Sequence, residues 1–185
     1  MKRRIYSKIT FICGLVLSFI TLSLIAGCPT RSAMMVPEKF EVAKKIHGSV
    51  RVDEVVGSRE TNSFQLWMSQ ISGVAFTEAL ADSIAKADLF DAVVKTDSAD
   101  YILDVTILSY DQPLIGLDLD IKMKTKWELT GTKKLVPVWS DTFEIAYKAR
   151  VSDALLPAER SQKAYEGAVR AAIAEGIKRL SEARF

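Results

Sequence analysis

The stretch from Leu117 to Thr130, LDLDIKMKTKWELT, alternates apolar and polar residues over its whole length. Successive side chains of a β-strand point to opposite faces, so this alternation predicts a long strand with one buried face and one wet face. Residues 131–134 form a predicted turn into a second alternating stretch, Val136 to Ala149. The two stretches are expected to pair as a hairpin.

Three further strands are predicted upstream of this hairpin. Tyr101 to Tyr110 is rich in β-branched and aromatic residues, which is typical of a central strand covered on at least one side. Ser49 to Val56 and Asp91 to Lys95 are shorter candidates. Residues 64–71, FQLWMSQI, fit a helical and a strand pattern nearly equally well, so their structure stays open.

Two helices are predicted from apolar residues spaced three and four positions apart. One runs from Gly73 to about Lys86, and a long one runs from about Ala158 to Arg184. The long helix carries a row of small residues that would let it lie close on a sheet, namely Ala168, Ala172 and Gly176.

The order of these elements is strand, helix, four strands, helix. It predicts an α+β fold in which an antiparallel sheet of about four to five strands has two helices packed on one face. The length of 185 residues, with 49% apolar and 26% charged residues, fits a single globular domain and excludes a disordered chain.

The amino-terminal segment carries a targeting pattern. Basic residues between Lys2 and Lys8 precede an uncharged apolar run, Ile9 to Ile25, and then Ala26, Gly27 and Cys28. This order resembles the bacterial lipoprotein signal, whose lipobox is an aliphatic residue, two small residues and a cysteine. The alternative is an uncleaved amino-terminal anchor with Cys28 as a bystander.

The resemblance to lipoproteins implies that Cys28 is lipidated and that cleavage precedes it. The chain then divides into a signal peptide (1–27), a lipidated cysteine with a tether (28–45) and a single periplasmic α+β domain (46–185). The residue directly after Cys28 is Pro29 and not an aspartate. In the enterobacterial pattern, the absence of aspartate at this place favours the outer membrane over the inner membrane. We therefore expect a lipid-anchored protein at the outer membrane, with its domain facing the periplasm.

The distribution of charge argues against a nucleic-acid partner. Residues 1–27 hold four of the 25 basic residues and none of the 23 acidic ones, so the rest of the chain has 21 basic against 23 acidic residues. Nucleic-acid binding requires a dense basic patch, which this balance does not provide.

The sequence also predicts no catalytic centre, no metal and no cofactor. The single histidine, His47, lies in a polar context, and no cysteine nucleophile remains after residue 28. Asp111, Asp118 and Asp120 could form a carboxylate cluster, but Lys122, Lys124 and Lys126 continue the same strand face. The preferred interpretation of these residues is a solvated, charged strand face.

Two segments resemble known envelope lipoproteins. FTEALADSIAKADLF (76–90) followed by ADYILDVTIL (99–108) is similar to the layout of the auxiliary lipoproteins of lipid-transporting ABC systems, of lipopolysaccharide-assembly lipoproteins and of the amino-terminal domain of TolB. The similarity covers most of residues 48–182 and lies in element order and patterning. It implies a fold more than a partner.

Leu114, Ile115 and Leu117 are the best candidates for contact with a partner or lipid, because they lie in a connection where polar residues are usual. The alternative is that this loop folds back onto the core. Trp67 could line a groove. The predicted function is that of a non-catalytic binding or assembly accessory, for which lipid or envelope-component transport is the process that the resemblance suggests. Its predicted partners are the membrane and an envelope protein or lipid. The alternative is an envelope hydrolase acting on peptidoglycan or lipid.

Replacing the predicted lipidation site tests the targeting pattern. We expect Cys28→Ala to abolish incorporation of a fatty-acid analogue and to leave an uncleaved precursor, because no other cysteine follows two small residues after an apolar run. Cys13→Ala is the matched control and should be labelled normally. Normal labelling of Cys28→Ala would contradict the prediction.

Overall fold

The computed structural model describes residues 32–57, 73–113, 118–133 and 136–184. Three helices are present in these residues: α2 (Ser32–Met35), α4 (Gly73–Lys86) and α5 (Pro157–Glu182). The strands are β1 (Ile46–Val52), β2 (Val56–Gly57), β3 (Phe90–Val93), β4 (Tyr101–Asp111), β5 (Leu119–Gly131) and β6 (Val136–Ala149). The predicted bounds of α4 and β6 are confirmed.

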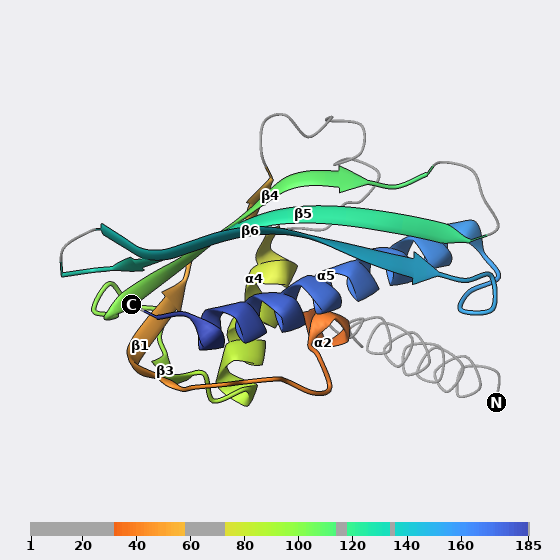
Figure 1. Cartoon of the computed structure of the whole chain (residues 1–185). Coiled ribbons are helices and arrows are strands. Elements are labelled where there is room, and N and C mark those ends of the chain that lie inside the picture. Colours follow the sequence, from red (N-terminus) through yellow and green to blue (C-terminus); the bar gives the residue numbers. More distant parts are fainter. Residues whose placement is uncertain (1–31, 58–72, 114–117, 134–135, 185) are drawn as a thin grey trace, which may run out of the picture. The chain divides into compact units, whose positions relative to one another are not determined.

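The strands form one sheet in the order β3-β1-β4-β5-β6, with β2 also paired to β4 (Figure 1). The α+β class and the antiparallel β4-β5-β6 meander are confirmed. The expectation of a wholly antiparallel sheet is wrong, because β1 pairs in parallel with β3 and β4, and β2 pairs in parallel with β4. Helix α4 lies between β1 and β3 in the chain and provides the crossover connection that parallel pairing needs.

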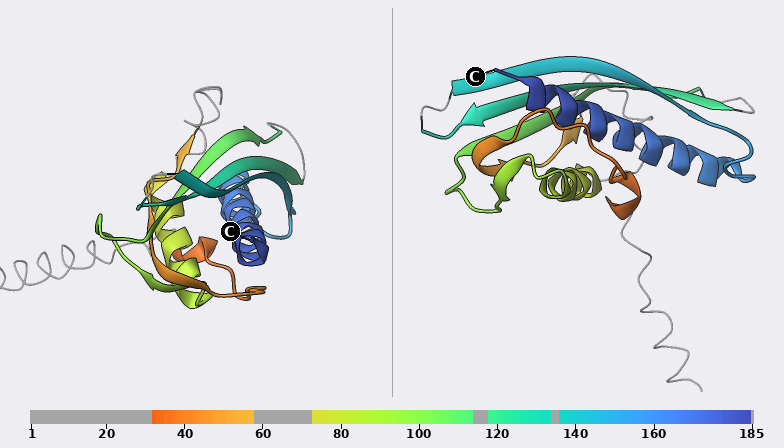
Figure 2. Two further views of the ribbon diagram at one scale, coloured as in Figure 1. Left: turned by 60° about the vertical axis from the view of Figure 1, so that its left-hand side comes forward. Right: turned by 60° about the horizontal axis from the view of Figure 1, so that its bottom comes forward.

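All three helices lie on one face of the sheet, and no described helix covers the other face, which we call the open face (Figures 1 and 2). The burial pattern of β5 explains this arrangement, because its side chains alternate strictly between buried and non-buried from Leu119 to Leu129. Its buried residues meet the apolar faces of the helices, in one core that includes Phe76 and Leu80 of α4 and Ile173 and Ile177 of α5. No helix among the described residues is long and apolar enough to span a membrane.

The long helix α5 approaches the sheet very closely at Gly176. A Cβ atom at this position would lie 2.3 Å from Cζ2 of Trp127, far inside van der Waals contact. The fully buried indole of Trp127 therefore occupies the space that a side chain on α5 would take. Its Nε1–H donates a hydrogen bond to Oγ1 of Thr125 at 3.1 Å, which satisfies the indole within the core. The predicted small-residue row thus faces the sheet, with Ala168 and Ala172 also fully buried.

The segment before β1 packs along α5, although the sequence analysis assigns residues up to 45 to a tether. Met35 of α2 is fully buried, and the Arg170 Nε–H donates a hydrogen bond to the Met34 carbonyl at 3.0 Å. Further along α5, the Ala43 N–H donates to Oγ of Ser181 at 2.9 Å. The apolar residues that carry this packing are too few to produce a recognisable period, so the sequence pattern did not reveal it.

Substitution at Gly176 tests the close approach. We expect Gly176→Ala to lower the free energy of unfolding by about 1–3 kcal/mol through overpacking against Trp127, even though alanine is favoured over glycine in a helix by about 1 kcal/mol. Gly131→Ala is the control, because its added Cβ would meet only Val138 Cγ1 at an ordinary 3.6 Å. Equal urea midpoints for both variants would show that α5 does not press on Trp127.

Candidate functional site on the open face of the sheet

A row of three lysines runs along β5 on the open face of the sheet. We call Lys122, Lys124 and Lys126 the lysine row; all three are exposed. Alternate residues of a strand lie about 7 Å apart on one face, so the row spans about 14 Å. Lys126 pairs with Glu128 at 2.8 Å, whereas Lys122 and Lys124 have no ion pair within the described part of the chain.

The strands on either side set the surroundings of the lysine row. Lys124 lies opposite Ser109 of β4 and Glu144 of β6, and Lys126 lies opposite Thr106 and Thr142. Lys122 lies opposite Asp111 and Ala146. The row is therefore bordered by both hydroxyls and carboxylates. Exposed ammonium groups with such weak partners can exchange them for the oxygens of a phosphate or carboxylate ligand.

Acidic side chains gather at one end of the row. Asp104 lies directly opposite Glu128 in the β4–β5 pair. Partial burial raises the pKa of Asp104 above its ordinary value, and the nearby carboxylates of Asp53 and Glu128 raise it further, while Arg51 opposes them. Glu128 pairs with Lys126 at 2.8 Å and Asp53 pairs with Arg51 at 2.7 Å, so Asp104 is the carboxyl at this end that has no ion pair within the described residues.

The other candidate carboxylates are engaged by neighbouring groups. Asp120 forms an ion pair with Lys148 of β6 at 3.2 Å, and Asp118 Oδ1 accepts a hydrogen bond from the Val151 N–H at 3.3 Å. No group of three or more His, Cys, Asp or Glu residues suited to a metal ion occurs in residues 32–57, 73–113, 118–133 and 136–184. These contacts agree with the interpretation of a charged, solvated strand face.

His47 lies at the opposite end of the domain from the start of α5, beside a surface pocket bordered by Asp100, Tyr101 and Val136. Its side chain is 89% exposed, and its Nδ1 lies 3.6 Å from Oδ2 of Asp91. Hydrogen bonds from the backbone and hydroxyl of Ser49 lower the pKa of the Asp100 carboxyl, so this carboxylate ties β1 to the start of β4.

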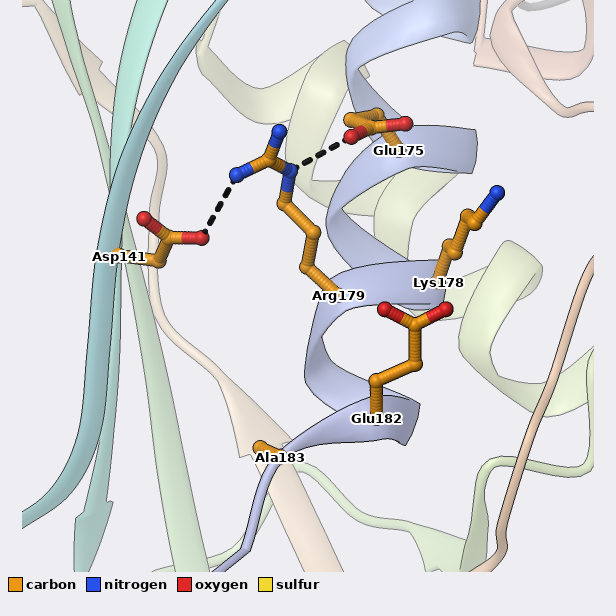
Figure 3. A pocket seen from close by; sticks show the side chains of 6 residues that line it. All are labelled: Asp141, Glu175, Lys178, Arg179, Glu182 and Ala183. Carbon is orange, nitrogen blue, oxygen red and sulfur yellow. Dashed lines mark hydrogen bonds and ion pairs between the residues drawn. The ribbon is translucent and has the colours of Figure 1, made fainter.

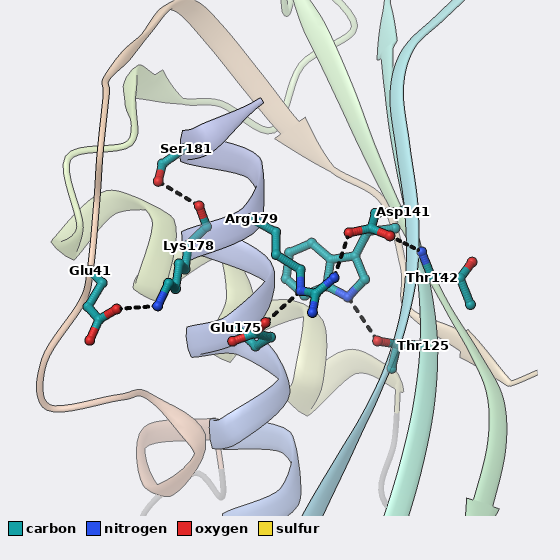
Figure 4. Close-up of polar contacts among 9 residues, drawn as sticks. Glu41, Thr125, Asp141, Thr142, Glu175, Lys178, Arg179 and Ser181 are labelled. Carbon is teal, nitrogen blue, oxygen red and sulfur yellow. Dashed lines mark hydrogen bonds and ion pairs between the residues drawn. The ribbon is translucent and has the colours of Figure 1, made fainter. Parts of the chain in front are cut away.

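A second pocket lies at the carboxyl end of α5, around Arg179 (Figure 3). The Arg179 guanidinium bridges Asp141 of β6 at 3.0 Å and Glu175 at 2.6 Å, and it lies 4.9 Å from the centre of the Phe143 ring. Hydrogen bonds to Glu175 and then to Asp141 raise the pKa of Arg179. The neighbouring Lys178 pairs with Glu41 at 2.7 Å (Figure 4). Because these charges neutralise one another, the pocket serves to clamp α5 to β6 and to the segment before β1.

Comparison with known families decides the relationship of the chain. Residues 62–182 match the LptE family, which is described as lipopolysaccharide-assembly. The chain belongs to the LptE family. It is an envelope lipoprotein of lipopolysaccharide-assembly type, which confirms one of the resemblances noted in its sequence. A search of curated proteins finds no significant match.

Solved structures show the same fold at low sequence identity. A crystal structure of a Xanthomonas campestris protein has a TM-score of 0.59 and 13% identity, covering 77% of this LptE-family chain and 89% of its own. A hypothetical protein from Chlamydia trachomatis has a TM-score of 0.52 and 9% identity, with coverages of 71% and 94%. The uncharacterized lipoprotein B from Nitrosomonas europaea has a TM-score of 0.51 and 11% identity, with coverages of 77% and 88%. At this identity the likeness concerns the fold alone.

The site residues predicted from the sequence lie outside the described residues of this LptE-family chain. They are Cys28, Trp67, Leu114, Ile115 and Leu117. The lysine row, in contrast, belongs to the alternating strand, and its sequence pattern predicts a charged, solvated strand face. Its lysines were recognisable, but the absence of ion pairs at Lys122 and Lys124 within the described residues depends on the geometry of β4 and β6.

The acidic end of the open face predicts a pH-dependent stability. Because folding raises the pKa of Asp104, the folded state holds this proton more tightly, and the associated stability is lost as the pH rises through the folded pKa. Asp104→Asn should therefore raise the melting temperature at pH 7. The gain should shrink as the pH falls through the raised pKa of the folded state, and it should be absent below the unfolded value of about 4.

Asp120→Asn is the control, because that carboxylate has a cationic partner in Lys148. Its melting temperature at pH 7 should stay equal to the parent or fall slightly. A lower melting temperature for Asp104→Asn at pH 7 would contradict the assigned repulsion.

Proposed function

We propose that this LptE-family protein is a lipid-anchored, non-catalytic accessory of lipopolysaccharide assembly at the periplasmic side of the outer membrane. The family match carries the proposal, because it extends over residues 62–182 and thus includes α4, the β4-β5-β6 meander and α5. The lipobox ending at Cys28 supports the anchor, and the absence of an aspartate after it supports the outer membrane.

The lysine row is the proposed contact for the phosphate groups of lipopolysaccharide. Its ammonium groups are exposed, two of the three lack an ion pair in the described regions, and they follow one another at about 7 Å along β5. Phosphate oxygens accept charge-assisted hydrogen bonds from lysine more strongly than neutral acceptors do. Neighbouring hydroxyls on Ser109, Thr106 and Thr142 could donate further hydrogen bonds to the same ligand.

The apolar candidates from the sequence complete this proposal. Leu114, Ile115 and Leu117 follow β4 in the chain, and Trp67 precedes α4. In this proposal they contact acyl chains or an envelope protein partner, since apolar residues in connecting segments are favoured where a ligand covers them.

Binding measurements on the mature lipoprotein in detergent test this function. We expect the triple variant Lys122→Gln, Lys124→Gln, Lys126→Gln to bind lipopolysaccharide about tenfold to a hundredfold more weakly, because each exposed charge contact contributes roughly 0.5–1 kcal/mol. The binding of the parent protein should also weaken with added salt. Lys148→Gln is the matched control on the same face, since Lys148 is already paired with Asp120.

Two outcomes would contradict the proposal. Unchanged affinity of the triple variant would remove the lysine row as the contact. A change in the mass of lipopolysaccharide or peptidoglycan fragments after incubation with the protein would favour the hydrolase alternative over a non-catalytic accessory.

A further inference from the structure

The connection between β6 and α5 exposes two consecutive leucines. Leu155 is 85% exposed and Leu156 is 61% exposed, more than any other large apolar residue in the described parts of the chain. The connection lies at the end of the sheet where β6 ends and α5 begins (Figure 1). Exposed apolar pairs of this kind are unfavourable in water and indicate a surface that is covered in the working protein.

This connection is tied together by its own hydrogen bonds. The Arg150 N–H donates to Oδ2 of Asp153 at 2.7 Å, and the Asp153 N–H donates back to the Arg150 carbonyl at 2.9 Å. The buried side chain of Arg160 donates from Nη1 to the Ala154 carbonyl at 3.1 Å. Ala154 is thereby held inward while the next two residues face outward. The exposure of the leucine pair is thus a consequence of an ordered local structure.

Cationic side chains lie beside the leucine pair. Arg150 and Lys163 are both exposed, and neither forms an ion pair with a carboxylate in the described regions. Lys163 Nζ donates to the Asp153 carbonyl at 2.5 Å, which holds it at the same connection. The exposed carboxylates of Asp153 and Glu159 lie in the same segment, so its charge is mixed. The two cations can contact the anionic phosphates of a phospholipid surface while the leucines reach the acyl chains beneath them.

The docked segment before β1 keeps this connection within reach of the membrane, an argument that rests on the proposed anchor at Cys28. Ser32 lies four positions after Cys28, a span of at most about 14 Å. Helix α2 is fixed to α5 at Arg170, and Leu156 lies fourteen residues earlier, about 21 Å along the helix axis. The anchor and the leucine pair can therefore meet one bilayer. We propose that Leu155 and Leu156 insert into the phospholipid layer that holds the lipid anchor.

Fluorescence quenching on the full mature lipoprotein tests this insertion. Leu155→Cys is labelled with an environment-sensitive fluorophore, and the protein is reconstituted in vesicles of phosphatidylethanolamine and phosphatidylglycerol, with or without bromine on the acyl chains. We expect several-fold stronger quenching in the brominated vesicles. The matched control is Val136→Cys, a 54% exposed apolar residue at the other end of β6, which should be quenched little.

The outcomes separate the anchor from the insertion. If the unlabelled protein fails to float with the vesicles, the lipid anchor is wrong and the insertion fails with it. If the protein floats but Leu155→Cys is quenched no more than Val136→Cys, the lipid anchor is supported and the insertion is wrong. This outcome includes the case in which a protein partner or a second copy of the chain covers the leucines. A far-ultraviolet circular dichroism spectrum equal to that of the parent confirms that each variant is folded.

Discussion

The contact between the indole of Trp127 and the bare backbone of α5 at Gly176 is the constraint on which the rest of the structure depends. Large aromatic side chains bury the most apolar surface, and here one of them fills the gap between a helix and a sheet without a competing side chain. The contact determines which face of β5 is inward. Because side chains alternate along β5, the same contact also determines that the lysine row points to the other face. The packing of the core and the position of the candidate binding surface therefore both depend on how β5 is oriented.

Electrostatic contacts act at the border of this packing. Arg179 joins α5 to β6 through Asp141, and Lys178 joins the same helix to the segment before β1 through Glu41. These pairs are largely exposed, and exposed ion pairs contribute little free energy. Their main role is to fix positions, since they connect β6 and the segment before β1 to the carboxyl end of α5.

Local patterns in the sequence predict the elements well and their pairing less well. The hairpin of β5 and β6 follows from alternation and a short turn, and α4 follows from apolar residues four positions apart. The parallel pairing of β1 with β3 and β4 depends on contacts between distant short strands, which no local period records. Helix α2 has only four residues, which are too few to show a helical period in the sequence. Its packing against α4 and α5 could therefore not be predicted. Of the candidate site, the lysines could be located from the sequence, whereas the absence of ion pairs at Lys122 and Lys124 within the described residues depends on the register of three strands.

The inward carboxylate of Asp141 has a consequence for the solubility of the folded chain. Strand β6 lies at an edge of the sheet, where unpaired backbone groups can recruit a strand from another molecule and begin aggregation. Asp141 lies in the middle of this strand with its charge held by Arg179, and Pro137 near its start has no N–H to offer. A strand from another molecule that paired with β6 would lie beside the Asp141–Arg179 ion pair and would find no N–H donor at Pro137. The edge is thereby protected against self-association, a property that suits a protein crowded onto a membrane surface.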